Sequence, residues 1–263
     1  MNGLIDQLSL FWPALLTAMT LAVAGGIGGV LVVLRRQTLL VLSLPQIVTL
    51  GAAIGLRMGW PTLPPAIAVV AAAVLLIAWS STRKASHLIL PALFVAGMCL
   101  SILVVAGAGA ELIQVQNMFV GIDVAVEPNQ AIIAGIVLTG IACAIAILWR
   151  RWILLAQAPA TAELANLRPT RWDLLFLCLI SSILLIGTDV MGTALAVVML
   201  FLPAATVLPW AKRVPTALLL AGIAGLLFVL LGFVLSIGMD WPLSQSIGGT
   251  GCAAFLLSHL LAR

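Results

Sequence analysis

Apolar stretches long enough to cross a lipid bilayer fill most of this chain and constrain its fold more than any other feature. A helix needs about 20 apolar residues to span the hydrocarbon core. Nine stretches of this kind can be placed, at roughly 11–34, 37–56, 62–80, 88–109, 131–149, 173–190, 193–210, 214–238 and 246–261. Hydrophobic residues make up 63% of the chain and charged residues 8%, too few to coat a soluble globule. The sequence therefore predicts an all-α, polytopic membrane protein, a single transmembrane domain over residues 1–263.

The positive charges predict how these spans are oriented. Eleven of the twelve Lys and Arg residues follow odd-numbered spans, and only Arg57 follows an even-numbered one. Because Lys and Arg are enriched in cytoplasmic loops, we expect the N-terminus outside and the C-terminus in the cytoplasm.

The eight Trp residues lie at the ends of the apolar stretches. Indole rings favour the headgroup region, where the ring is buried and its N–H stays hydrated. We interpret them as interface anchors: Trp12, Trp60 and Trp241 at the outer boundary, and Trp79, Trp149, Trp152, Trp172 and Trp210 at the inner one.

Two regions between spans are long enough to carry a function. Residues 110–130 lie on the predicted outer side and mix apolar with polar residues, so we expect short helices packed over a cavity mouth rather than a surface loop. Residues 150–172 lie on the cytoplasmic side, where Pro159 can open a short helix and Pro169 can end it. This helix is either a docking element for a soluble partner or an ordinary connector, and periodicity alone does not decide between them.

The missing motifs narrow the function. There is no HExxH pair and no Walker A sequence, and the four Cys residues fall inside apolar spans without metal-ligand spacing. No acidic or basic residue is placed firmly at mid-span, which argues against a proton- or sodium-driven carrier. We therefore expect neither catalysis nor a metal site nor a cofactor in this chain, and any energy source would be another subunit.

Three stretches resemble permease subunits of bacterial ABC importers for zinc, manganese and iron. Residues 191–213 are similar to the family's segment of a Gly, an apolar helix and Pro-Ala-Ala-Thr before a basic turn. Residues 230–249 are similar to its Gly-Leu-x-x-Ser…Asp-x-Pro pattern, with Ser244 in place of a Gly. Residues 32–55 resemble its Arg-Arg turn and second helix.

The resemblance implies a fold like that of cobalamin and siderophore importers with fewer helices. It implies a second permease copy, identical or different, two ATPase subunits that bind ATP, and an external solute-binding protein, all at a bacterial cytoplasmic membrane. Residues 158–168 would then be the helix that docks on the ATPase, with Pro159, Ala162, Glu163 and Asn166 as candidate coupling residues.

The chain departs from the family at the substrate site. The family's second helix carries an Asp and, four residues later, a His that bind a divalent cation; the matching positions here are Leu42 and Gln46. Leu cannot bind a metal, and an amide oxygen is a weak ligand for zinc or manganese. Ser43, Gln46 and Thr49 are the candidate pathway residues that replace them. Alternatively, these three side chains bind a neighbouring helix.

Two functions remain open. The first is the membrane subunit of an ABC importer for a metal ion or metal complex, with siderophore-bound iron as one candidate. The second is a non-transporting accessory or sensor subunit on the same fold.

Overall fold

Each of the nine apolar stretches forms a helix in the computed structural model, which describes residues 2–81, 86–106, 109–120, 126–157, 169–239 and 241–261. These nine are α1 (Asn2–Leu34), α2 (Thr38–Met58), α3 (Leu63–Ser81), α4 (Ser86–Val104), α6 (Pro128–Gln157), α8 (Pro169–Met191), α9 (Thr193–Val207), α10 (Val214–Met239) and α11 (Leu243–Leu261). A shorter helix, α5 (Gly109–Val120), lies between α4 and α6 in the chain. The prediction of an all-α membrane protein is confirmed, and five of the described helices are long and apolar enough, by length and composition, to cross a bilayer.

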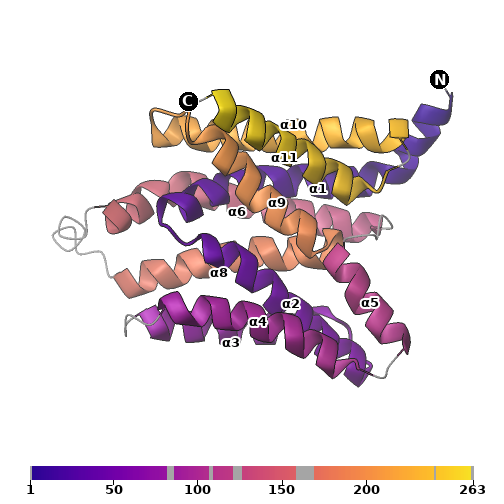
Figure 1. Ribbon diagram of the computed structural model, residues 1–263, viewed down its shortest axis with the longest axis horizontal. Coiled ribbons are helices and arrows are strands. Elements are labelled where there is room, and N and C mark those ends of the chain that lie inside the picture. The colour runs from indigo at the N-terminus through magenta and orange to yellow at the C-terminus, as the bar shows by residue number, and fades with distance from the viewer. Residues whose placement is uncertain are drawn as a thin grey trace.

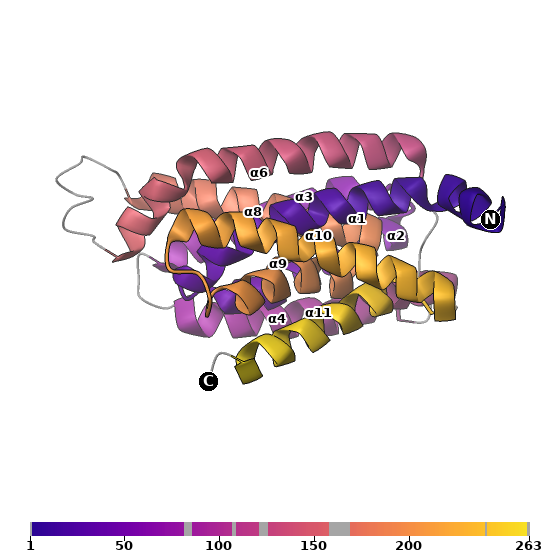
Figure 2. The same cartoon turned by 90° about the horizontal axis from the view of Figure 1, so that it is seen from above.

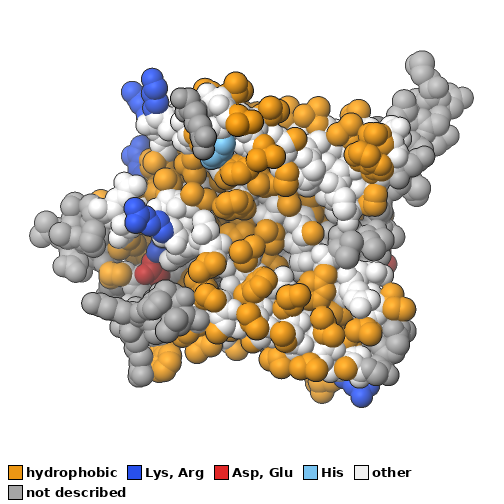
Figure 3. Space-filling view, in the orientation of Figure 1, with side chains coloured by type: hydrophobic (Ala, Val, Ile, Leu, Met, Phe, Trp, Pro, Cys, Tyr) orange, Lys and Arg blue, Asp and Glu red, His pale blue; other side chains and the backbone are white. Residues whose placement is uncertain are grey.

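The helices lie side by side along the long axis of the molecule (Figure 1). Helices α2, α3 and α4 form one side, and α10 and α11 form the other. Helix α1 lies between them and packs against α6, α9 and α10, while α8 packs against α3, α6 and α9 (Figure 2). Hydrophobic side chains also cover much of the visible surface (Figure 3). An apolar exterior of this kind is expected where lipid is the solvent.

Small residues allow the closest helix contacts. A Cβ on Gly25 would lie 2.7 Å from the Met199 carbonyl oxygen, and one on Gly29 would overlap the Leu200 carbonyl. On α2, a Cβ on Gly51 would overlap the Ala66 Cα of α3. Contacts between backbones at this distance require Gly, because any side chain would push the helices apart.

Four prolines lie inside the described helices without dividing them: Pro13, Pro45, Pro91 and Pro203. Helix α2 continues through Pro45 and α9 continues through Pro203. A proline removes a backbone hydrogen bond, so a kink or a break is expected at Pro45 and Pro203. Neither helix is broken there, because helical residues continue on both sides of each ring.

Positive side chains gather at the left-hand end of the molecule, where α6 ends and α8 begins (Figures 1 and 3). This distribution agrees with the separation of charges in the sequence. It identifies two chemically different ends of the bundle, while the assignment of one end to the cytoplasm stays a prediction.

Candidate functional site

One face of α2 is open at the surface and carries the two positions where the chain departs from the family's metal ligands. Leu39 and Leu42 are 43% and 45% exposed, and Gln46 follows one turn later and is half-buried. These positions are spaced by three and four residues, so they form one stripe along the helix. Leu42 and Gln46 therefore share an accessible face that contains no charge.

Ser43 and Thr49 lie inside the subunit. The Ser43 hydroxyl is buried and approaches the carbonyl oxygens of Leu90 on α4, at 2.7 Å, and of Leu39, at 2.8 Å. The buried Thr49 hydroxyl donates to the Pro45 carbonyl oxygen at 3.0 Å. Ser43 and Thr49 are buried whereas Gln46 is half-buried, and a pathway role for the three residues stays a prediction. For Ser43, the contact with a neighbouring helix is the alternative that the sequence left open.

Gln46 is the one of the three that reaches the open stripe. Its side-chain oxygen is buried and has no hydrogen-bond partner among the described residues. Gly97 of α4 packs directly against the carbonyl carbon and the Cβ of Gln46, because a Cβ on Gly97 would lie 2.8 Å from both atoms. A buried amide oxygen without a partner is costly, and a ligand that donates a hydrogen bond would satisfy it. The pathway role of Gln46 stays a prediction.

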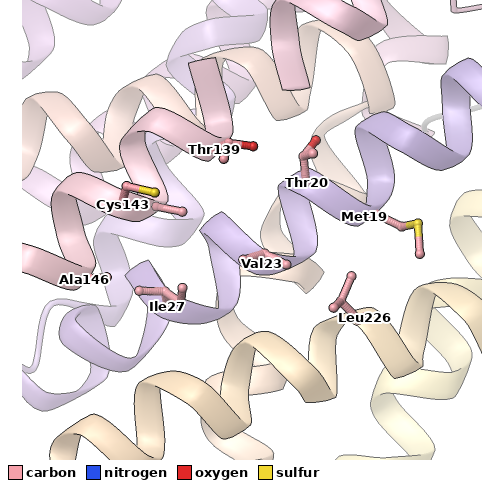
Figure 4. A pocket seen from close by; sticks show the side chains of 9 residues that line it. Met19, Thr20, Val23, Ile27, Thr139, Cys143, Ala146 and Leu226 are labelled. Atoms are coloured by element: carbon pink, nitrogen blue, oxygen red, sulfur yellow. The ribbon is translucent and has the colours of Figure 1, made fainter. Parts of the chain in front are cut away.

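A separate cavity of about 430 Å³ lies between α1, α6 and α10 (Figure 4). Its lining is almost entirely apolar, with Thr20 of α1 and Thr139 of α6 as the hydroxyl-bearing residues. The Thr20 hydroxyl approaches the carbonyl oxygens of Leu16 and Thr17 of its own helix, at 3.0 and 3.1 Å. A cation would lose its hydration here without replacement ligands, so this cavity does not suit a metal route.

The end of the bundle opposite the basic end is closed partly by α5 (Figure 1). Val115 of α5 is fully buried against Ala53 and Val105. The Thr193 hydroxyl at the start of α9 donates to the Phe119 carbonyl oxygen at 2.9 Å. Part of the region 110–130 thus packs on the bundle, while residues 121–125 lie outside the described part, and a role over a pathway mouth stays a prediction.

At the opposite end, aromatic and charged side chains from three helices meet. Arg35, which follows α1, forms an ion pair with Asp173 of α8 and lies over the Phe176 ring, 4.4 Å from its centroid. Trp152 of α6 is fully buried, and its indole N–H donates to the Trp172 carbonyl oxygen at 2.9 Å. The interpretation of Trp152 as an interface anchor is therefore wrong, because its ring packs between helices.

This cluster was not predicted from the sequence. Its signal was Asp173, an acidic residue on the strongly basic side of the chain. The four candidate coupling residues Pro159, Ala162, Glu163 and Asn166 lie outside the described residues, between the ends of α6 and α8.

Comparison with known proteins assigns the family. The model of the ABC 3 transport family matches residues 7–262, almost the whole chain. The chain belongs to the ABC 3 transport family. Membership makes it a multi-pass transport permease and confirms the resemblance found in its sequence motifs.

Similar proteins carry metal-related names. The manganese import system permease protein ScaB of Streptococcus parasanguinis is 23% identical over 260 residues, which cover 98% of this chain and 92% of that protein. A chain of PsaBC from Streptococcus pneumoniae, solved in complex with Fab, has a TM-score of 0.84 at 22% identity, covering 98% of this chain and 94% of the solved one. A metal-chelate type ABC transporter in an inward-facing conformation has a TM-score of 0.69 at 16% identity, covering 100% and 91%. At these identities the solved structures establish the ABC permease fold.

Proposed function

We propose that this permease is the membrane subunit of an ABC importer that carries a metal ion or a metal complex into the cytoplasm. The family match over almost the whole chain carries this proposal, and the name of the manganese import relative supports the metal. Two ATPase subunits supply the energy, a second permease copy completes the pathway, and a solute-binding protein delivers the substrate. The chain itself binds no nucleotide and catalyses no reaction.

The stripe on α2 favours a substrate that brings its own ligands. Two permeases that face each other across this stripe would line the pathway with Leu42 and Gln46. Neither side chain offers the carboxylate or imidazole that holds bare zinc or manganese. A chelated metal, such as iron bound by a siderophore, needs only hydrogen bonds and apolar contact along such a path. We therefore rank a metal complex ahead of a free cation.

The second candidate is a non-transporting accessory or sensor subunit on the same fold. The absence of the family's Asp and His at positions 42 and 46 is the observation that favours it. Genes for an ATPase and a solute-binding protein beside this one would favour the importer instead.

Docking of the ATPase tests the proposal. We expect the permease to co-purify with the ATPase encoded beside it, through residues 158–168. Ala162→Trp adds a large ring to this segment and should abolish co-purification while the protein still inserts in the membrane. Ala106→Trp, near the predicted outer end of α4, is the matched control and should leave co-purification intact. Co-purification and transport that survive Ala162→Trp would show that this segment does not couple the two subunits.

A further inference from the structure

The end of α6 is held to the start of α8 by a buried aromatic contact. Helix α6 has 30 residues and is about 45 Å long, so it extends beyond a hydrocarbon core of about 30 Å. Near its end, Trp152 packs edge-on against Trp172 and Phe176 of α8, with ring centroids 6.2 and 5.6 Å apart. Its N–H bond to the Trp172 carbonyl oxygen fixes the ring. The helix ends on either side of residues 158–168 therefore belong to one packed unit.

Arg35 connects this unit to α1. Its side chain is 7% exposed, pairs with Asp173 through Nη2 and stacks over Phe176. The Nη1 atom is buried without a hydrogen-bond partner among the described residues, so within that part of the chain Asp173 is its counter-ion. The guanidinium is buried while the Asp173 side chain is 35% exposed, so separating the two would leave the Arg35 charge buried and unpaired. The ion pair therefore ties Arg35 to the start of α8.

The turn that holds Arg35 is itself fixed. The Gln37 N–H donates to the Val32 carbonyl oxygen and the Arg36 N–H donates to the Val33 carbonyl oxygen, each at 3.0 Å. Arg36 has a φ of 57°, the left-handed conformation of a Schellman cap. Helix α2 begins at Thr38, so Leu42 and Gln46 follow about 6 and 12 Å along its axis.

We infer that Arg35, Asp173 and Trp152 form a mechanical link that carries ATPase movement from residues 158–168 to the pathway face of α2. The inference rests on the proposed function, because it requires an ATPase at that segment. A contiguous chain of packed groups joins the segment's two ends to Leu42 and Gln46, and such networks transmit coupling between sites. Arg35 and Asp173 are positioning residues in this link, and neither lies on the open stripe.

The test follows the accessibility of α2 and needs no known substrate. The four native Cys residues are replaced by Ala, Leu42→Cys is introduced, and the full permease–ATPase complex is placed in nanodiscs. The labelling rate of position 42 by a maleimide is measured without nucleotide and with a non-hydrolysable ATP analogue. The variant is the pair Arg35→Gln with Asp173→Asn, which removes both charges together and leaves no unpaired buried charge. Arg36→Asn is the control, since Arg36 is the exposed neighbour and Asn tolerates its backbone conformation.

In the complex with Arg35 and Asp173 intact, the analogue should change the labelling rate by about fivefold or more, the low end of allosteric coupling. Arg36→Asn should keep this change. The double variant should retain its ATPase, yet the change should fall below about twofold. If the analogue still changes the labelling rate fivefold in the double variant, the proposed link is wrong. The link is also wrong if the double variant loses its ATPase, because the cluster would then be a docking site for that subunit. If the analogue has no effect even with Arg35 and Asp173 intact, the proposed function itself fails, and the link with it.

Discussion

At the residue scale, the proposed substrate pathway passes two uncharged positions of α2. Leu42 is exposed and Gln46 is half-buried, and both lie on the same open stripe. A Leu side chain offers no lone pair, and an amide oxygen carries no charge. The resting permease should therefore not hold a bare divalent cation at this point of α2.

We predict that Leu42→Asp with Gln46→His creates a zinc site on α2. Residues four apart lie on the same helical face, so the carboxylate and the imidazole can share one ion. Titration of the purified double variant with Zn²⁺ should give saturable binding that the unmodified permease lacks, and transport of the native substrate should slow. Saturable zinc binding by the unmodified permease that disappears in Gln46→Ala would contradict this account.

At the element scale, the spacing between α2 and α4 depends on a single Gly. Gly97 brings the α4 backbone against the backbone of Gln46, and the Ser43 hydroxyl bonds to α4 at Leu90. These two contacts, at Ser43 and at Gln46, lie about one turn apart on α2, and both hold α4 against it. The position of Gln46 on the open stripe is therefore set by α4.

We predict that Gly97→Ala destabilises the permease by about 1–3 kcal/mol, because the added methyl group meets backbone that cannot move aside. The melting temperature of the purified protein in detergent measures the effect. Gly140→Ala on α6 is the matched control, since nothing lies within 4 Å of its Cβ position. The control should be neutral or stabilising by about 0.4–1 kcal/mol. Equal melting temperatures for the two variants would mean that the contact at Gly97 is not tight.

The elements also show how far the sequence alone could lead. Length and hydropathy placed all nine apolar helices, because a bilayer requires about 20 apolar residues for each span. They could not orient each helix, since lipid-facing and packed faces are equally apolar. On α10, Leu227 is 50% exposed and its neighbour Phe228 is 4% exposed, although both are large hydrophobic residues. The same ambiguity concealed that Ser43 faces α4 while Leu42 faces outward.

At the scale of the whole molecule, the two ends of the bundle differ in charge. Positive side chains gather at the end that holds Arg35 and Asp173 (Figure 3). The basic end was predicted from the sequence, but the cluster around Trp152 was not. Its members come from different helices, and Arg35 and Asp173 are 138 residues apart in the chain. Only the packing of α1, α6 and α8 brings them together.

We predict that the N-terminus and α5 lie outside the cell and that residues 158–168 lie in the cytoplasm. Ile113→Cys on α5, in a background without native Cys, should react with a membrane-impermeant maleimide added to intact cells. Ala165→Cys should react only after the cells are opened. The reverse pattern would invert the topology and place the basic end outside.

In the proposed function, this permease imports a metal while a partner subunit hydrolyses ATP. The most direct measurement places the permease, its ATPase and its solute-binding protein in proteoliposomes and follows uptake of Mn²⁺, Zn²⁺ and an Fe³⁺–siderophore complex with and without ATP. We predict ATP-dependent uptake of the chelate that requires all three components, with less uptake of the free cations. Failure of the complete, ATP-hydrolysing system to take up any of the three would contradict the account.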